Sequence, residues 1–191
     1  MREIFFITSN KDKFKEASSI INSVRLKKKD IDYFEVQDSI ERVSELGAKF
    51  AYQKIKKPLI VEDSGLFIDF LDGFPGPYSA YVYDKIGNKG ILKLLSGIEK
   101  REATFKSVIS YFDGDIQETF TGSISGRISK YIKGNMGFGY DPIFIVENQD
   151  KTFGEMETGE KNKFSHRKKA FKKFDIWANR DLNNCVSNKK P

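Results

Sequence analysis

The feature that most constrains the fold is an uninterrupted apolar run, Leu59, Ile60 and Val61, which directly follows Pro58. Such a run without polar alternation is typical of a short strand that is buried on both faces. The next four residues, EDSG at 62–65, end the apolar pattern. We therefore predict an α/β fold in which this core strand stops at the acids.

Two acids at the end of a core strand need a physical reason. A carboxylate that emerges from an apolar sheet is strongly destabilising unless it is hydrogen-bonded, paired or bound to a metal. Strand ends in α/β proteins are where ligands bind, but an acid before Gly65 is also typical of a capping or turn residue. The loop that follows, FPGPYS at 74–79, is stiff and can present a ring and a hydroxyl beside the strand end.

The length and composition of the chain favour one folded domain. It has 191 residues, of which 39% are hydrophobic and 14% aromatic. We expect a single domain over residues 1–180 and a polar tail over residues 181–191. The chain has no long apolar run and no signal-peptide layout, so we expect a soluble, cytoplasmic protein. The single cysteine, Cys185, has no His or acid beside it and is expected to be inert.

Positive charge is concentrated near the C-terminus. Residues 160–191 contain 10 Lys or Arg and 3 Asp or Glu, whereas residues 1–159 contain 23 and 24. A basic segment of this kind suits a nucleic-acid surface, the attraction of a small polyanion, or the solvated face of a lysine-rich helix. Composition does not choose among these three.

A second candidate site lies near the N-terminus. Residues 3–7, EIFFI, are typical of a strand, and apolar residues recur at helical spacing from Phe14 to Val24. The polar turn between them, TSNKDK at 8–13, would place hydroxyl, amide and lysine side chains at a helix N-terminus, which suits an anion. The turn lacks the glycines of a Walker loop, so an ordinary capped helix start is the alternative.

A third acid, Glu35, lies in the segment YFEVQ at 33–37, which alternates like a half-buried strand. Asp38 with Glu41 resembles a capping box that opens a helix. Lys49 lies off the apolar stripe of this helix, so it faces either solvent or a cleft. The stripe itself has a 3.6-residue period at Ile40, Val43, Gly47, Phe50 and Ala51.

The middle of the chain supplies further helices, strands and a glycine-rich loop. We expect two short helices over residues 81–95 that break near Gly87, then a hairpin of strands 102–112 and 116–124. The loop GNMGFGYDP, at 134–142, carries two rings on a glycine-spaced backbone. It is either a stacking platform for a flat ligand or a loop that plugs the core.

A basic motif, KNKFSHR at 161–167, precedes the final helix. Ser165 is a natural N-cap, so His166 and Arg167 are expected in the first turn with their donors directed outward. Basic residues oppose the helix dipole at that end, and an anionic or keto-bearing ligand would reverse the effect. His166 has no second His or Cys at metal spacing, so we do not expect it to bind a metal.

Together these parts suit a nucleoside polyphosphate and a hard divalent cation. Five motifs, in the order TSNKDK, VEDSGL, FPGPYS, FGYDP and EKNKFSHR, make the chain similar to the inosine triphosphate pyrophosphatase family. The similarity runs from about Phe6 to Trp177. It implies an α/β fold with an elongated central mixed sheet flanked by helices, in two lobes with the active-site cleft between them.

The resemblance also implies an activity. Members of this family hydrolyse the non-standard purine nucleotides ITP, dITP and XTP to the monophosphate and pyrophosphate, with Mg²⁺ and usually as homodimers. We therefore expect a nucleoside triphosphate pyrophosphohydrolase that binds no specific nucleic acid and no membrane. Two alternatives are a pyrophosphatase of other modified nucleotides on the same fold and a basic nucleic-acid-binding module. A nucleic-acid-binding module would not explain the presence of Glu35 and Asp63.

The resemblance assigns roles by position in this sequence. Asp63 resembles the catalytic acid and, with Glu35, the metal-binding pair, while Lys49 matches a helix lysine only loosely as a catalytic residue. His166 and Arg167 can donate to the 6-keto oxygen of the purine. The implied substrate-binding residues are Thr8, Ser9, Asn10, Lys11, Asp12 and Lys13 at the triphosphate, Ser64 beside the catalytic acid, Phe138, Gly139, Tyr140 and Asp141 at the base, and Lys161, His166 and Arg167 as the remaining contacts.

Overall fold

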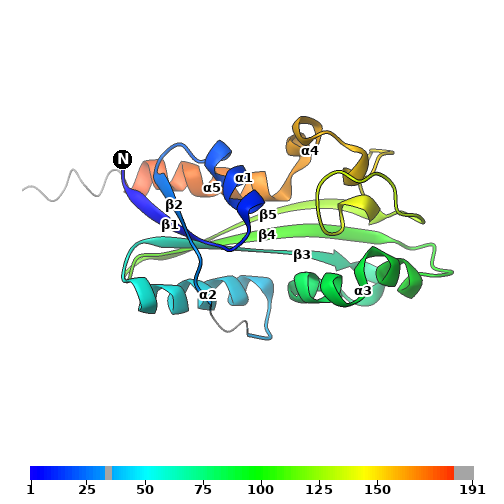
Figure 1. Ribbon diagram of the computed structural model, residues 1–191, viewed down its shortest axis with the longest axis horizontal. Helices are drawn as coiled ribbons and strands as arrows, with labels where there is room; N and C mark the ends of the chain where they lie inside the picture. The colour runs from blue at the N-terminus through cyan, green and yellow to red at the C-terminus, as the bar shows by residue number, and fades with distance from the viewer. Residues whose placement is uncertain (33–35, 183–191) are drawn as a thin grey trace, which may run out of the picture. The chain divides into compact units, whose positions relative to one another are not determined.

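The computed structural model describes residues 1–32 and 36–182. Within these residues six strands form one sheet in the order β2-β1-β3-β4-β5-β6 (Figure 1). β1 pairs in parallel with β2 and β3, whereas β5 and β6 are antiparallel, so the sheet is mixed as predicted. The strands are β1 Glu3–Ile7, β2 Arg25–Lys29, β3 Leu59–Ile68, β4 Glu102–Phe112, β5 Gln117–Ile128 and β6 Phe144–Val146.

Helices and short helical turns connect these strands. The α-helices are α1 Lys11–Ile20, α2 Ile40–Ile55, α3 Ser79–Leu94, α4 Thr158–Phe164 and α5 His166–Trp177. The 3₁₀ turns are η1 Asp69–Leu71, η2 Gly76–Tyr78, η3 Asp141–Ile143 and η4 Phe153–Glu155, and the π-helical segment η5 Ala178–Leu182 follows α5. In the part of the chain that the structure describes, no helix is both long enough and apolar enough to cross a membrane.

The chain folds into two compact units, each built from separate stretches of sequence. The first unit comprises Met1–Asp63, Ser107–Gly122 and Arg167–Pro191, and the second comprises Ser64–Lys106 and Ser123–His166. β3, β4 and β5 contribute residues to both units. Because each unit has its own apolar core, the two are described separately below.

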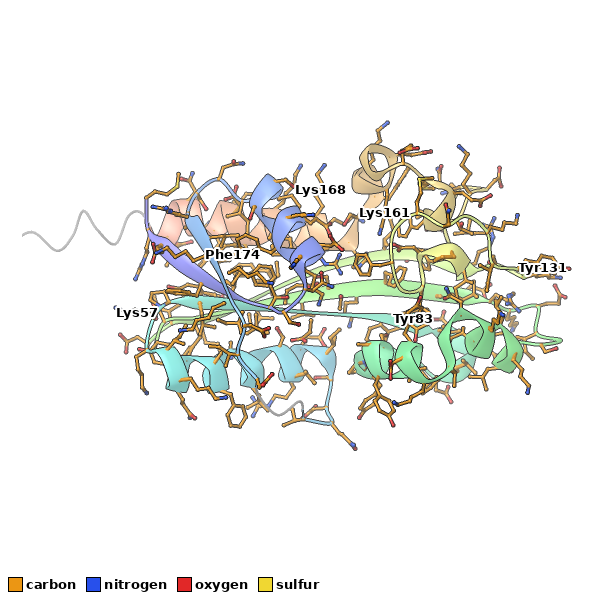
Figure 2. The ribbon with its side chains drawn as sticks, viewed as in Figure 1. Lys57, Tyr83, Tyr131, Lys161, Lys168 and Phe174 are labelled. Atoms are coloured by element: carbon orange, nitrogen blue, oxygen red, sulfur yellow. The ribbon has the colours of Figure 1, made fainter. Side chains whose placement is uncertain are left out.

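In the first unit, helices cover both faces of the sheet. Ile60 packs in a cluster with residues of α1 and α5, among them Phe174, which is labelled in Figure 2. Its neighbours Leu59 and Val61 pack instead in a cluster with Ala48 and Ala51 of α2. Figure 1 shows α1 and α5 on one side of these strands and α2 on the other. The prediction of a strand buried on both faces is therefore confirmed.

The expectation that this strand stops at the acids is wrong. β3 continues through EDSG to Ile68, so Glu62 and Asp63 lie inside a ten-residue strand. Gly65 does not make a turn, because it lies inside β3. A Cβ on it would lie 2.3 Å from the carbonyl oxygen of Gly76. Glycine is required there because the backbone of the following loop packs directly against β3.

The core of the second unit is formed by α3, the C-terminal parts of β3 and β5, the N-terminal part of β4 and the segments around β6. The break expected in the helical region of residues 81–95 is confirmed, since Gly87 has a φ of 57° inside α3. The hairpin is also confirmed, because β4 and β5 are joined by a turn in which the Asp113 side chain accepts hydrogen bonds from two following backbone N–H groups. Leu66, Ile91 and Phe144 are fully buried in this core.

Several local expectations in the N-terminal third need correction. The charged segment RLKKK is the edge strand β2, which was not predicted from the sequence, and lysines are well suited to an exposed strand at a sheet edge. Residues 33–35 of the predicted strand lie outside the described residues. Helix α1 ends at Ile20, before Val24, and α2 is capped by Ser39 rather than Asp38.

Candidate active site

The turn at residues 8–13 forms a capped helix start. The Asn10 side chain is the N-cap of α1 and accepts hydrogen bonds from the N–H groups of Asp12 at 2.8 Å and Lys13 at 3.0 Å. Thr8 Oγ1 accepts from Asn10 N at 3.1 Å and stiffens the turn. The Lys28 ammonium donates to the Ser9 carbonyl oxygen. The turn is therefore held in one conformation, with the Lys11 and Asp12 side chains exposed on its outer surface.

Strand pairing places this turn beside the acids of β3. Ile7, the last residue of β1, pairs with Val61 on the parallel strand β3. Thr8 therefore leaves the sheet where β3 enters Glu62 and Asp63, and β1 covers the edge of β3 no further. At this point Lys13 Nζ donates to the Glu62 carbonyl oxygen at 3.2 Å and forms an ion pair with Glu62 Oε2 at 2.8 Å.

The Glu62 carboxylate is the centre of a buried ion network. Its Oε1 accepts from Ser107 Oγ at 2.6 Å and from Arg167 Nε at 3.1 Å, while its Oε2 is paired with Lys13. Arg167 Nη1 also binds Glu16 Oε2 at 2.8 Å. Glu62 and Arg167 are each 4% exposed. These side chains come from α1, β3, β4 and α5, so the carboxylate ties four elements together.

The electrostatics of the network keep its groups charged. Burial by itself would raise the pKa of Glu62, but the charges of Lys13 and Arg167 and the hydrogen bonds from Lys13 and Ser107 hold that pKa far below its ordinary value. Burial would lower the pKa of Arg167, and the carboxylates of Glu62 and Glu16 raise it instead. The sequence drew attention to Glu62 only as a neighbour of Asp63 and did not single out Glu16 or Ser107. Only the spacing of two residues between Ile60 and Glu62 would have placed Glu62 on the α1 and α5 side of the strand.

Asp63 and Ser64 follow on the same strand and are partly buried. Since successive side chains of a strand point to opposite faces, Asp63 lies on the other side of β3 from Glu62, the side of Val61 and α2. Lys49 is partly buried on α2, next to the buried Ala48.

The described residues contain no cluster of three candidate metal ligands. Among the described residues, no group of three or more His, Cys, Asp or Glu side chains could hold a metal ion. Glu35, the predicted partner of Asp63, lies outside them. The predicted metal pair is thus represented by Asp63 alone.

In the second unit, the loop at 134–142 and helix α4 build a cluster of rings and charges. The Lys161 ammonium, labelled in Figure 2, forms an ion pair with Asp141 Oδ2 at 2.6 Å. It also lies over two rings, 5.1 Å from the centroid of Phe138 and 5.4 Å from that of Phe153. The Phe138 N–H donates to Asp141, so the loop, its acid and its lysine hold one another. Phe138 is 43% exposed, and the ammonium over its ring is a cation–π contact.

The second ring of the loop has a structural role. Tyr140 is 4% exposed, donates its hydroxyl to the Ser79 carbonyl oxygen at 2.9 Å and packs edge-on against Tyr83. Burial first and the Tyr83 hydroxyl second raise the pKa of Tyr140. The two alternatives for this loop therefore both apply: Phe138 is exposed, whereas Tyr140 plugs the core. Ser79 is also buried, and its hydroxyl accepts from Leu66 N and donates to the Gly76 carbonyl oxygen, so this hydroxyl of the FPGPYS loop has a structural role.

The expectation that His166 and Arg167 point outward is wrong. His166 is 5% exposed and its ring stacks on Phe105, with centroids 4.9 Å apart and planes 8° from parallel. Phe105 is held in turn by Phe144, at a centroid distance of 4.5 Å. In Arg167, Nε binds Glu62 and Nη1 binds Glu16. The cause is burial: α5 packs its first turn inward, where charge requires partners.

One cavity of the second unit contains none of the predicted residues. It has a volume of about 370 Å³ and is lined by Arg101, Arg127, Lys130 and Tyr131, among others. Arg101 donates to the carbonyl oxygens of four residues and is only 8% exposed, so its guanidinium holds the backbone together. Tyr131 is labelled in Figure 2. Arg101 thus has a structural role, and we do not include this cavity in the candidate site.

Comparison with known proteins extends over nearly the whole chain. A dITP/XTP pyrophosphatase of Methanopyrus kandleri is 50% identical over 179 residues, which cover 92% of this chain and 95% of the relative. A protein of the same name from Thermococcus kodakarensis is 48% identical, covering 93% of this chain and 97% of its own. The resemblance predicted from the five motifs is thereby confirmed.

Solved structures agree with the fold. The Ham1 protein of Staphylococcus aureus superposes with a TM-score of 0.84 at 30% sequence identity, covering 92% of this chain and 97% of that protein. The predicted α/β fold with a mixed sheet flanked by helices is confirmed by this likeness. The model of the Ham1 family matches residues 4–177. From the length of that match and the identity to these relatives, the chain belongs to the Ham1 family.

Proposed function

We propose that this protein hydrolyses ITP, dITP and XTP to the corresponding monophosphate and pyrophosphate, and so removes non-standard purines from the cytoplasmic nucleotide pool. Relatives about half identical in sequence carry the name dITP/XTP pyrophosphatase. A nucleic-acid-binding module is disfavoured by this relationship.

The observation that carries the proposal is the register of β1 and β3. Because Ile7 pairs with Val61, the capped turn at residues 8–13 and the carboxylate-bearing segment of β3 lie at the same end of parallel strands. Ligands of α/β sheets bind at the carboxyl ends of strands. Lys13 is 20% exposed at its side chain and supplies positive charge at this point. This combination suits a polyphosphate chain next to a hydrolytic acid.

The reaction follows from these groups. The oxygen of a water molecule forms a bond to the α-phosphorus, and the bond from that phosphorus to the bridging oxygen breaks. Pyrophosphate leaves, and the proton of the water passes to a base. We assign Asp63 to this step, either as the acceptor of the proton or as the ligand of a divalent metal. Lys13 stabilises the charge of the leaving pyrophosphate, and Ser64 contacts the substrate beside Asp63.

The donor set is compatible with Mg²⁺. This ion is commonly held by one or two carboxylates together with waters and substrate phosphates, so Asp63 with Glu35 is a sufficient set. When bound, Mg²⁺ neutralises phosphate charge and lowers the pKa of a bound water. Lys49, on the α2 side of the sheet with Asp63, is the remaining candidate for a catalytic cation.

We assign base recognition to Phe138 and His166 of the second unit. Phe138 offers the exposed ring on which a purine stacks. His166, held flat against Phe105, offers a ring N–H to the 6-keto oxygen of hypoxanthine or xanthine. Adenine has an amino group at that position and would leave the donor unsatisfied, so discrimination of about 10⁴-fold against ATP is expected.

The test is pyrophosphate release from a nucleotide panel. The purified protein is assayed with ITP, dITP, XTP, ATP, GTP and modified pyrimidine triphosphates, with Mg²⁺ and with excess chelator. We expect release from the first three only and none with chelator. Preferential release from a pyrimidine nucleotide would favour the alternative of a pyrophosphatase for other modified nucleotides. Activity that does not depend on metal would contradict the Mg²⁺ assignment.

We further propose that the protein is a homodimer, as expected from its family resemblance. Light scattering coupled to gel filtration tests this directly. A mass near 22 kDa, that of one chain, would contradict it, since the chain has a mass of 21.9 kDa.

A further inference from the structure

We propose that Glu62 and Ser107 are positioning residues for Lys13, and that their network sets the affinity of the site for the pyrophosphate part of the substrate. The inference rests on the proposed function, because Lys13 is taken as the lysine that binds the phosphates. It concerns two residues that are not themselves expected to touch the substrate.

Glu62 holds the Lys13 ammonium at two points. The ammonium binds both the side-chain Oε2 at 2.8 Å and the main-chain oxygen at 3.2 Å of the same residue. A lysine side chain has four rotatable bonds and is normally mobile, so two fixed acceptors on a rigid strand restrict it strongly. Among the described residues, the ammonium donates a hydrogen bond to the main-chain oxygen, and its contact to Oε2 is an ion pair, so N–H donors remain for a phosphate oxygen.

Ser107 and Arg167 hold the Glu62 carboxylate in turn. Both donate to Oε1, the oxygen that Lys13 does not use, at 2.6 Å and 3.1 Å. The Ser107 hydroxyl is fully buried on β4, and its bond to a carboxylate is of the strong, charge-assisted type. The hydrogen bonds to Oε1 fix the orientation of the carboxylate, so Oε2 points toward Lys13. A substrate that binds Lys13 does not need to break the bonds to Oε1.

The fixed position of Lys13 affects phosphate binding. A preorganised ammonium loses little freedom when a phosphate arrives, and this reduces the entropic cost of binding. Loss of the Ser107 hydroxyl would loosen the carboxylate and so the ammonium. We expect Ser107→Ala to weaken pyrophosphate binding and to raise KM for ITP about 10-fold, with kcat changed less than about 2-fold.

The chain offers a matched control. Ser110 lies on the same strand, is equally buried, and its hydroxyl is 3.3 Å from Thr119 Oγ1. Among the described residues, this hydroxyl makes no hydrogen bond to the side chains of the ion network. Ser110→Ala removes the same atom from the same strand and should leave KM and pyrophosphate affinity unchanged. Urea unfolding of both variants separates a general loss of stability from the specific effect.

The decisive experiment is a double-mutant cycle read by calorimetric titration with inorganic pyrophosphate. Affinity is measured for the wild type, Ser107→Ala, Lys13→Met and the double variant. If Ser107 acts through Lys13, its substitution costs about 10-fold in the wild type and nothing in the Lys13→Met background. Should Ser107→Ala fail to fold, the cycle is run with Glu62→Gln, which keeps the volume of the side chain.

Two outcomes overturn the inference: an affinity of Ser107→Ala equal to that of Ser110→Ala, or an equal loss with and without Lys13. The proposed function fails in a different way, through absence of pyrophosphate release from every purine nucleotide by the wild type. Because the cycle measures binding rather than turnover, its result stands in either case.

Discussion

Replacing Gly65 by alanine tests whether the close approach inside the second unit shapes the strand that carries the acids. An added Cβ would lie 2.3 Å from the Gly76 carbonyl oxygen and 2.9 Å from its carbonyl carbon. Both atoms are backbone, so no side chain can rotate away. Since carbon and oxygen atoms in contact are normally more than about 3.2 Å apart, the two backbone segments must separate by about 0.9 Å.

The magnitude follows from this displacement. Overpacking of a well-packed interior costs about 1–3 kcal/mol, and a clash between two main-chain segments belongs at the upper end of that range. We expect Gly65→Ala to lower the free energy of unfolding by about 3 kcal/mol and Tm by about 6–12 °C for a chain of this size. The measurement is urea and thermal unfolding followed by circular dichroism. Asp63 is two residues away on the same strand, so pyrophosphate release should fall as well.

Gly159→Ala is the control for Gly65→Ala. Gly159 lies in α4, and a Cβ there would meet nothing within 4 Å. Alanine favours a helix over glycine by about 1 kcal/mol, so this variant should be as stable as the wild type or more so. A Gly65→Ala protein within about 0.5 kcal/mol of the wild type would refute the reasoning, because it would show that the β3 and η2 backbones separate at no cost.

Three further outcomes are expected. Asp63→Asn should lower pyrophosphate release from ITP by at least about 100-fold with an unchanged unfolding curve, and near-normal turnover would remove Asp63 from the reaction. Phe138→Ala should raise KM for ITP about 10-fold with kcat largely kept, since a stacked base is lost; an unchanged KM would make the ring part of the scaffold. Burial would raise the pKa of Asp113, but the N–H of Ile116, the Tyr111 hydroxyl and further donors lower it overall. Asp113 thus stabilises the fold above its unfolded pKa and loses this effect as pH falls through its folded pKa. Asp113→Asn should therefore lower the free energy of unfolding at about pH 7 and not at about pH 2, and an equal loss at both values would contradict the assignment.

Local patterns along the chain predicted the elements that depend on nearby residues. The apolar run at Leu59, Ile60 and Val61 predicted a doubly buried strand, and Gly87 predicted the break in the helix of the second unit. The turn at Asp113 was predicted as a hairpin. These features are decided by periodicity, backbone freedom and side-chain bonding over a few residues, which a sequence displays directly.

Elements whose status depends on distant partners were predicted less well. The charged segment of β2 forms a strand only because β1 offers it a parallel partner at the sheet edge. Continuation of β3 past Glu62 depends on Lys13, Ser107 and Arg167 to neutralise and bond the carboxylate. No pattern in residues 59–65 contains that information.

The candidate site divides in the same way. By itself, the sequence determined the family through five ordered motifs, and with it the identity of the acids, lysines and rings assigned to the nucleotide. Only the tertiary structure decided which of these side chains are buried and which partners they contact. Tyr140 is in the core while Phe138 is exposed, and Arg167 forms ion pairs with two carboxylates. The physical reason is that a motif specifies which chemical groups are available. Their orientation, burial and charge are set by neighbours as far as 151 positions away in the chain, as in the contact of Arg167 with Glu16.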